Sequence, residues 1–312
     1  MQLDIGLNVL RALGGLYAIL VAASASVLWL RWRAPENDRT ELVQRIRSWW
    51  LIVSIFSIAM IVSRNVSVAF FAFVSFLALK EYLSIVPTRR ADRRVLFWAY
   101  LAIPVQYYWV AEAWYGMFII FIPVYVFLLL PLRMVLIGET KEFLRAAGTL
   151  HWGIMTLVFG ISHVAYLLVL PEASYPNAGG PGLVLFLVFL TQFNDVAQYL
   201  WGKTLGRHKI IPKVSPNKTW EGFLGGVATT TLLSLLLSGW LTPMSWRIAI
   251  AAGLLISIAG FIGDVTISAL KRDIGLKDSG SMLPGHGGIL DRIDSLTYTA
   301  PLFFHFVYYL YY

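Results

Sequence analysis

The chain has 312 residues, of which 58% are hydrophobic and 13% are charged, and its mean hydropathy is +0.69. A water-soluble domain of this length needs more charged residues to cover its surface, so the composition excludes a soluble enzyme and a disordered chain. The absence of cysteine excludes a disulfide scaffold and thiolate chemistry, while the net charge of +8 leaves nucleic acid, anionic lipid and acidic substrates open.

Ten apolar runs approach or reach the length of about 17 to 25 residues that a helix needs to cross a bilayer. They lie at residues 7–30, 49–63, 66–84, 95–111, 115–132, 152–170, 183–201, 222–241, 247–267 and 295–312. The start of the chain lacks the basic region of a cleavable signal peptide, so the first run is predicted to be a transmembrane helix. The second run is short and only three residues separate it from the third, so one long or re-entrant segment is an alternative.

The Lys and Arg residues lie in alternate connections between these runs, with the exceptions of Arg11, Arg64 and Arg247. Cytoplasmic loops are enriched in Lys and Arg, so these connections are predicted to face the cytoplasm and both termini the opposite side. The same pattern favours two separate helices for the second and third runs. Basic residues spread over membrane-flanking loops also argue against a nucleic-acid partner. The predicted fold is an all-α, polytopic integral membrane protein with about ten transmembrane helices.

Acidic residues are scarce, and in the second half of the chain they gather on the predicted cytoplasmic side. They are Asp195, Glu221, Asp264, Asp273, Asp278, Asp291 and Asp294. Asp195 and Asp264 fall within or at the end of apolar runs, where a carboxylate costs about 2.5 to 3.5 kcal/mol and usually faces a partner, a metal or water. An ion pair with a neighbouring helix is one interpretation. A site for Mg²⁺, which prefers oxygen ligands and leaves room for phosphates, is the other.

The basic loop at residues 202–222 runs directly into an apolar run. Ser215 or Thr219 is placed to cap the N-terminus of that helix. Backbone donors, the helix dipole and Lys218 would then converge on an anion, which is typical of a phosphate site. The alternatives are an ordinary capped helix start and basic residues that only follow the positive-inside tendency.

The segment 268–294 is too polar to span a membrane and carries glycines around His286. Gly285, Gly287 and Gly288 permit positive φ and a close backbone approach to a ligand. If a helix resumes after Gly288, Asp291 and Asp294 lie three residues apart on one face, a spacing suited to joint metal coordination. A glycine-rich turn before a helix start with favourable acidic residues is the alternative.

This segment resembles the signature of the phosphatidate cytidylyltransferase (CDP-diacylglycerol synthase) family. Every fixed position of that signature is present: Ser268, Lys271, Arg272, Lys277, Asp278, His286, Gly287, Gly288, Asp291, Arg292 and Asp294. Residues 213–222 also resemble the other well-marked loop of the family. The resemblance covers residues 150–312 by motif and 45–150 by hydropathy. It implies three parts: an additional transmembrane segment at 1–34, membrane helices at 35–150, and a catalytic membrane domain at 151–312.

The resemblance implies transfer of a cytidylyl group from CTP to phosphatidate, with Mg²⁺ required, alone or with a second cation. Such chemistry depends on positioning and charge neutralisation for in-line attack on phosphorus. Asp264 and Asp291 match the family's metal positions, and Asp195 and Asp294 are assigned as supporting residues. The phosphate-holding residues would be Lys218, Lys271, Arg272, Lys277 and Arg292, and Asp278 and His286 complete the predicted catalytic set. His286 could donate to pyrophosphate or stabilise its loop.

The remaining predicted binding residues are Asn194, Lys213, Ser215, Thr219, Glu221, Gly287 and Gly288. The predicted partners are CTP, phosphatidate and membrane lipids, and a homodimer is compatible with the sequence. The predicted location is a bacterial inner (cytoplasmic) membrane.

Around Asp195, residues 193–199 depart from the pattern of several family members, which carry a small residue before this Asp and Ser-Gly after it.

Three other functions stay open at this point. Two are enzymatic: a CTP-dependent polyprenol or phytol kinase, and a cytidylyltransferase for another lipid phosphate. The third is an ion-coupled transporter that uses Asp195, Asp264 and His163, although His163 alone is most simply a hydrogen-bond partner between helices.

Overall fold

The structure is a computed structural model that describes residues 6–33, 40–171, 178–280 and 287–312. In these ranges every named element is a helix, as predicted. The helices up to residue 135 are α1 (Leu7–Arg33), α2 (Thr40–Val62), α3 (Arg64–Ile85), η1 (Arg90–Asp92), α4 (Arg93–Ala111), α5 (Tyr115–Ile120), η2 (Phe121–Val126) and α6 (Phe127–Val135). The later ones are α7 (Phe143–Ile154), η3 (Met155–Phe159), α8 (Gly160–Leu167), α9 (Gly179–Leu205), α10 (Trp220–Leu241), α11 (Trp246–Asp273), α12 (Leu290–Ile293) and α13 (Leu296–Tyr311).

All ten apolar runs form helix, and eight helical stretches of the described chain are long and apolar enough to cross a membrane. The two runs outside this set are α4 and the 16-residue α13. The chain is therefore an all-α polytopic membrane protein. The predicted domain boundary at residue 150 lies inside α7, and the stretch from α7 to α8 continues as one helix through the π-helical turn η3.

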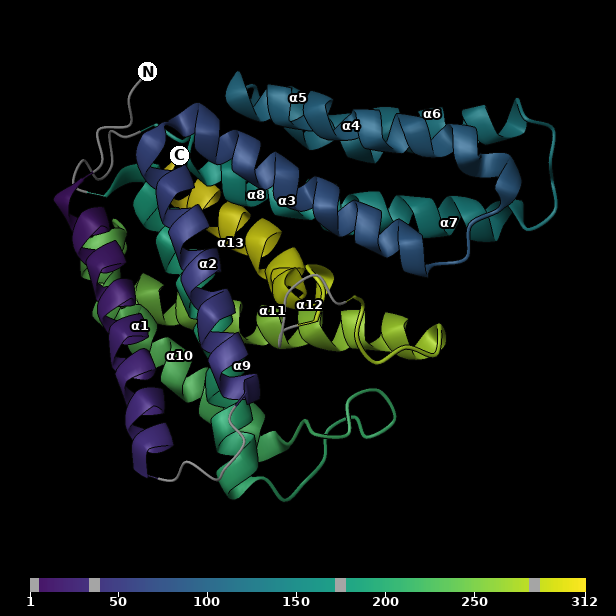
Figure 1. The fold of residues 1–312 in the computed structure, drawn as a ribbon. Helices are drawn as coiled ribbons and strands as arrows, with labels where there is room; N and C mark the ends of the chain where they lie inside the picture. The colour runs from purple at the N-terminus through teal and green to yellow at the C-terminus, as the bar shows by residue number, and fades with distance from the viewer. Residues whose placement is uncertain (1–5, 34–39, 172–177, 281–286) are drawn as a thin grey trace.

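The second and third apolar runs form two separate helices, and the alternative of one long segment is wrong. Ser63 has an extended backbone between α2 and α3, and its side chain accepts a hydrogen bond from the Val66 amide, as an N-cap does. The Ser67 hydroxyl donates to the Ala59 carbonyl across the turn at 2.8 Å. The chain therefore turns sharply at Ser63, and α3 leads away from the end of α2 at a wide angle (Figure 1).

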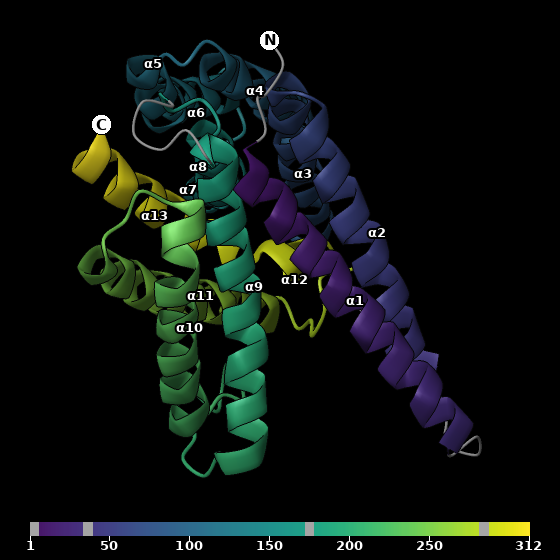
Figure 2. The same ribbon diagram turned by 90° about the vertical axis from the view of Figure 1, so that its left-hand side faces the viewer.

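The two ends of the described chain lie at the same end of the bundle. Figure 1 shows the start of α1 and the end of α13 at the upper left, whereas the α9–α10 connection lies at the bottom and the α3–α4 and α6–α7 connections lie at the right. Figure 2 shows the same separation between the start of α1 and the α9–α10 connection. The α3–α4, α6–α7 and α9–α10 connections thus lie away from the start of α1 and the end of α13, and the membrane side that each connection faces stays a prediction.

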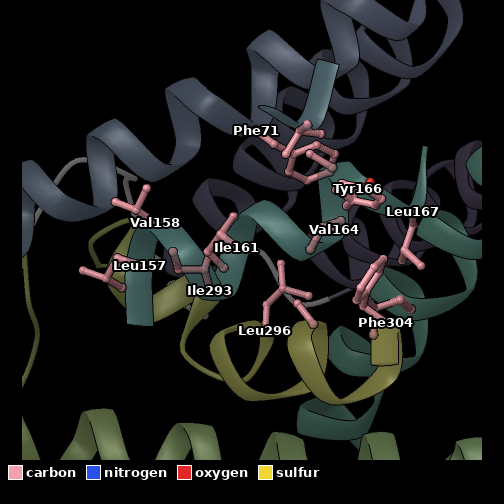
Figure 3. Packing of buried hydrophobic residues seen from close by; sticks show 14 of the residues in the cluster. Phe71, Leu157, Val158, Ile161, Val164, Tyr166, Leu167, Ile293, Leu296 and Phe304 are labelled. Carbon is pink, nitrogen blue, oxygen red and sulfur yellow. The ribbon is translucent and has the colours of Figure 1, made fainter. Parts of the chain in front are cut away.

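The centre of the core is α8, in which every residue is buried. Figure 3 shows Ile161, Val164 and Leu167 of this helix packed between Phe71 of α3 and Leu296 of α13. Because α13 packs along the most buried helix of the protein, the short connection between α12 and α13 is held in a fixed place. That connection contains Asp294 and Ser295.

Glycines allow α9, α10 and α11 to approach closely, as small residues do in membrane helix pairs. A Cβ on Gly222 of α10 would lie 2.7 Å from the Gln198 carbonyl of α9. On α11, a Cβ on Gly263 would lie 2.5 Å from the Asp294 carbonyl. The first contact brings α10 against α9, and the second brings α11 against the α12–α13 connection.

Tyr107 of α4 is buried against α3. It is 4% exposed, and its hydroxyl is hydrogen-bonded to Ser75 of α3 at 2.7 Å. The sequence pattern shows an aromatic near a helix end but not the neighbouring helix that covers it.

Candidate active site

The first half of the site joins three segments around Lys218. The Lys218 ammonium forms an ion pair with Asp264 of α11 and donates a hydrogen bond to the Gln198 side-chain oxygen of α9 at 3.2 Å. Both side chains of the ion pair are about one-fifth exposed. Asp195 of α9 accepts from the Ser295 hydroxyl, with distances of 2.9 and 3.1 Å to its two oxygens. The ion pair that was one interpretation of a carboxylate at membrane depth is therefore present at Asp264.

The electrostatics of this group show that three carboxylates lie near one another. Burial disfavours the charged form of Lys218, but the charges of Asp264 and Asp195 outweigh it and raise the pKa of Lys218. Burial, followed by the charges of Asp264 and Asp195, raises the pKa of Asp294 well above its ordinary value. Burial and these charges therefore favour the neutral form of Asp294, and a cation bound beside the three carboxylates would favour its charged form.

A second group forms around Asp291, one turn earlier on α12. Lys271 of α11 donates to Asp291 Oδ1 at 2.6 Å. Asp291 Oδ2 accepts from the Ser279 amide at 3.0 Å, the Ser279 hydroxyl at 2.9 Å and the Gly288 amide at 3.1 Å. Burial opposes ionisation of Asp291, but the hydrogen bond and charge of Lys271, with the two amides, lower its pKa below the ordinary value.

Asp291 and Asp294 therefore enter different hydrogen-bond groups, although their spacing predicted one shared face. The regular helix α12 ends at Ile293, and Asp294 Oδ1 accepts from the Ser295 amide at 2.7 Å. Among the described residues, no three acidic or histidine side chains are grouped so that they could hold a metal ion. The carboxylate oxygens fit Mg²⁺ by their chemistry, and the set of ligands stays a prediction.

Glu81 of α3 belongs to the second group and is absent from the sequence-based site. It is 8% exposed and accepts from the Ser279 hydroxyl at 2.5 Å and from the Ile289 and Leu290 amides at 2.8 and 3.2 Å. The available signal was an acidic residue in an apolar run, near the same membrane side as Asp195 and Asp264.

The glycines of the signature approach protein carboxylates. Gly287 has a φ of +78°, and a Cβ on it would lie 2.7 Å from Asp291 Oδ2. A Cβ on Gly288 would collide with the Glu81 carboxylate and lie 2.6 Å from the Ser279 hydroxyl. Close approach, predicted for these glycines, is thus present in the structure. The groups approached are Glu81 and Asp291, while His286 and Gly285 lie outside the described residues.

The loop before α10 is fixed by its own hydrogen bonds. Thr219 is the N-cap of α10, and its side chain accepts from the Gly222 amide at 3.2 Å, which confirms one of the two predicted caps. Ser215 instead lies one turn earlier, where its carbonyl accepts from the Lys218 amide at 3.2 Å. Glu221 accepts from the Arg207 amide at 3.0 Å and from His208 Nδ1 at 2.6 Å. Glu221 thereby holds the loop that presents Lys218.

Arg272 and Asn194 connect segments of the site. Arg272 donates from Nε to the Val214 carbonyl and from a terminal nitrogen to the Leu276 carbonyl, both at 3.2 Å. It therefore joins the two loops of the site.

Asn194 of α9 donates to the Ser257 carbonyl of α11 at 3.3 Å and accepts from the Thr230 hydroxyl of α10 at 3.2 Å. Its amide thus links three helices, a role that the sequence prediction did not include.

The other predicted residues fall into two kinds. Lys213, Lys277 and Asp278 have exposed side chains on the two loops. Arg292 lies inside: its Nε is buried without a hydrogen-bond partner in the structure, and its charge acts on Asp195. A buried guanidinium nitrogen without a partner is suited to an incoming phosphate oxygen.

His163 does not form the expected hydrogen bond between helices. Its Nδ1 is paired with the Phe159 carbonyl of the preceding helical turn at 2.7 Å. Its ring packs edge-on against Phe118 and Phe159. The sequence interpretation of His163 as an interhelical partner is therefore wrong.

Comparison with known proteins gives the family. Residues 43–310 match the cytidylyltransferase family. The "Uncharacterized protein YnbB" of Escherichia coli (strain K12) is 48% identical over 299 residues, which cover 96% of this chain and 98% of that protein. A phosphatidate cytidylyltransferase of Staphylococcus aureus (strain COL) is 38% identical over 150 residues, 47% of this chain and 58% of the relative. One from Brucella suis biovar 1 is 44% identical over 124 residues, 39% and 46% of the two chains. This membrane-spanning nucleotidyltransferase thus belongs to the cytidylyltransferase family.

Proposed function

We propose that this enzyme transfers the cytidylyl group of CTP to phosphatidate, forming CDP-diacylglycerol and releasing pyrophosphate. The observation that carries the proposal is the convergence of Lys218, Lys271 and Arg292 with four carboxylates at one end of α9, α11 and α12. Two relatives that bear the name phosphatidate cytidylyltransferase support the lipid substrate.

The arrangement suits a reaction between two phosphates. Each substrate is an anion, so cationic side chains are needed to bring the attacking oxygen of the lipid phosphate to the α-phosphorus of CTP. In this proposal Lys218 and the buried Nε of Arg292 hold phosphate oxygens near Asp195, supported by the charges that both exert on Asp195. We assign Asp264 and Asp291 as the residues that would hold Mg²⁺, supported by Asp195 and Asp294. Bound Mg²⁺ would neutralise charge on the phosphate oxygens.

We further propose that the protein lies in a bacterial inner membrane with this site toward the cytoplasm. The support is the concentration of Lys and Arg in the connections on the side of the site. A homodimer and the absence of a nucleic-acid partner stay predictions.

A cytidylyltransferase acting on another lipid phosphate is the second candidate. The stretch 193–199 departs from the family pattern, and the structure places part of this stretch at the site, because Gln198 contacts Lys218 directly. A change of side chain at that place alters the surroundings of the bound phosphate. The departure at residues 193–199 therefore affects which lipid phosphate the enzyme accepts, and it leaves the reaction class unchanged.

The test uses the full-length protein in detergent with CTP, Mg²⁺ and phosphatidate, and it measures pyrophosphate and CDP-diacylglycerol. Asp264→Asn and Asp291→Asn should abolish turnover, whereas Asp273→Asn, an exposed position on the same helix as Asp264, should retain it. Pyrophosphate release that needs a different lipid phosphate would favour the second candidate. Release of CDP would identify a kinase, and folded protein that forms neither product with phosphatidate would refute the leading proposal.

A further inference from the structure

Helix α3 brings a buried carboxylate to the signature loop of the site. Glu81 lies near the end of α3, 198 residues before Ser279 in sequence, and is 8% exposed. Its neighbour Lys80 is exposed, so at the end of α3 the Glu81 side chain lies on the buried face of the helix and Lys80 on the exposed face. An acidic side chain that loses its contact with water needs several hydrogen bonds in return.

The hydrogen bonds come from the start of α12. Glu81 Oε2 accepts from the Ile289 amide, and Oε1 accepts from the Leu290 amide. These amides belong to the first turn of a helix, whose N–H groups have no partner inside that helix. Glu81, a residue of α3, thus caps the N-terminus of α12. Its negative charge makes these hydrogen bonds stronger than bonds to a neutral acceptor.

The same loop atoms also hold Asp291. The Ser279 hydroxyl lies 2.5 Å from Glu81 Oε1 and 2.9 Å from Asp291 Oδ2, and its single proton can be donated to one of them at a time. The Gly288 amide donates to Asp291, while the next two amides donate to Glu81. Three consecutive amides, those of residues 288–290, therefore donate to these two carboxylates. Movement of that segment away from Glu81 also moves the donors that orient Asp291.

We propose that Glu81 is a positioning residue for nucleotidyl transfer. It fixes residues 288–290 and Ser279, and through them it holds the Asp291 carboxylate against Lys271. Glu81 acts through the loop and contacts no substrate. The helices of the first half of the chain are thereby required for a site whose other residues lie in the second half. The kinetic test of this inference rests on the proposed function.

The experiment compares full-length Glu81→Gln with Lys80→Ala, the exposed neighbour on the same helix. Glutamine keeps the shape of the side chain but turns an NH₂ donor toward the Ile289 or Leu290 amide, so one hydrogen bond is replaced by repulsion. With phosphatidate and CTP, we expect kcat of Glu81→Gln to fall about 10- to 100-fold, as misplacement of a reacting group by about 1 Å does. The KM for phosphatidate should stay within about twofold, and Lys80→Ala should behave as the wild type.

A second readout does not depend on the substrate. Hydrogen–deuterium exchange should become about tenfold faster in peptides covering residues 287–291 of Glu81→Gln, because those amides lose a charged acceptor. Exchange in α9 and α10 should be unchanged. If the wild type is inactive with phosphatidate, the proposed function fails while the exchange result still decides whether Glu81 orders the loop.

Two results would overturn the inference. One is a wild-type kcat in folded Glu81→Gln, and the other is unchanged exchange at residues 287–291. If Glu81→Gln does not fold, Ser279→Ala tests the same link, because it removes only the hydroxyl shared by Glu81 and Asp291. A kcat and exchange pattern like the wild type in Ser279→Ala would then reject the positioning role.

Discussion

Replacement of Lys271 by methionine tests how the buried ion pair of the site stabilises the protein. The Lys271 ammonium lies 2.6 Å from Asp291 Oδ1, and the two side chains are 11% and 7% exposed. At this distance and an effective dielectric constant of about 20, the gross attraction between unit charges is about 6 kcal/mol. The cost of removing both charges from water offsets much of that energy, so the pair as a whole contributes less.

The variant Lys271→Met leaves Asp291 buried without its cation, and removal of one partner of such a pair costs about 3 to 5 kcal/mol. Asp291 keeps the amides of Ser279 and Gly288 as donors, and it shares the Ser279 hydroxyl with Glu81. We therefore expect a loss of stability at the lower end of this range, about 3 kcal/mol, equivalent to a fall of about 5 °C in the midpoint of thermal unfolding.

The assay is thermal unfolding in detergent, followed by intrinsic tryptophan fluorescence, for Lys271→Met, Asp291→Asn and the double variant. The double variant lacks both charges of the pair, so its midpoint should lie above that of Lys271→Met. A single variant that unfolds at the wild-type temperature would refute the reasoning. So would a double variant whose loss equals the sum of the two single losses, because the residues would then be independent.

Three further predictions concern local structure. Gly288→Ala should lower both the unfolding temperature and turnover, because its Cβ collides with the Glu81 carboxylate; Gly148→Ala, in the interior of α7 where a Cβ meets nothing within 4 Å, should lower neither. Thr219→Ala should cost about 1 kcal/mol through loss of the α10 cap, measured by thermal unfolding, and Thr219→Ser should retain most of the stability. Since the pKa of Asp291 is lower in the folded protein than its ordinary value of 3.8, its contribution to stability is complete above that value and lost as the pH falls below it. Unfolding midpoints between pH 5 and 3 should therefore fall more steeply for the wild type than for Asp291→Asn, and equal slopes would contradict the prediction.

The elements of the fold were predictable because membrane insertion imposes a simple pattern. A helix that crosses lipid must satisfy its backbone internally and carry an apolar surface, so each span is visible as an apolar run. The separation of α2 from α3 followed from the alternation of basic loops, and Ser63 provides its structural reason. The Thr219 cap followed from a polar residue placed directly before an apolar run.

The site was predictable only in part, because a one-dimensional pattern shows which residues are unusual but not which of them meet. Lys218, Asp264 and Asp291 stand out in an apolar sequence, and the structure brings each of them into an ion pair. The spacing of Asp291 and Asp294 suggested one shared face, but α12 ends between them and their side chains enter different groups. Because α12 has a single turn, helical periodicity does not fix the directions in which the Asp291 and Asp294 side chains point.

The sequence by itself determined that this protein lies in lipid, that its helices follow the ten apolar runs, and that residues 268–294 resemble the signature of a nucleotidyltransferase family. Only the tertiary structure decided that Glu81 of α3 meets Ser279 and the start of α12. The physical reason is that helix pairing in a membrane depends on shape and on hydrogen bonds between particular side chains. Apolar surface is alike on every helix and does not specify which neighbour it meets.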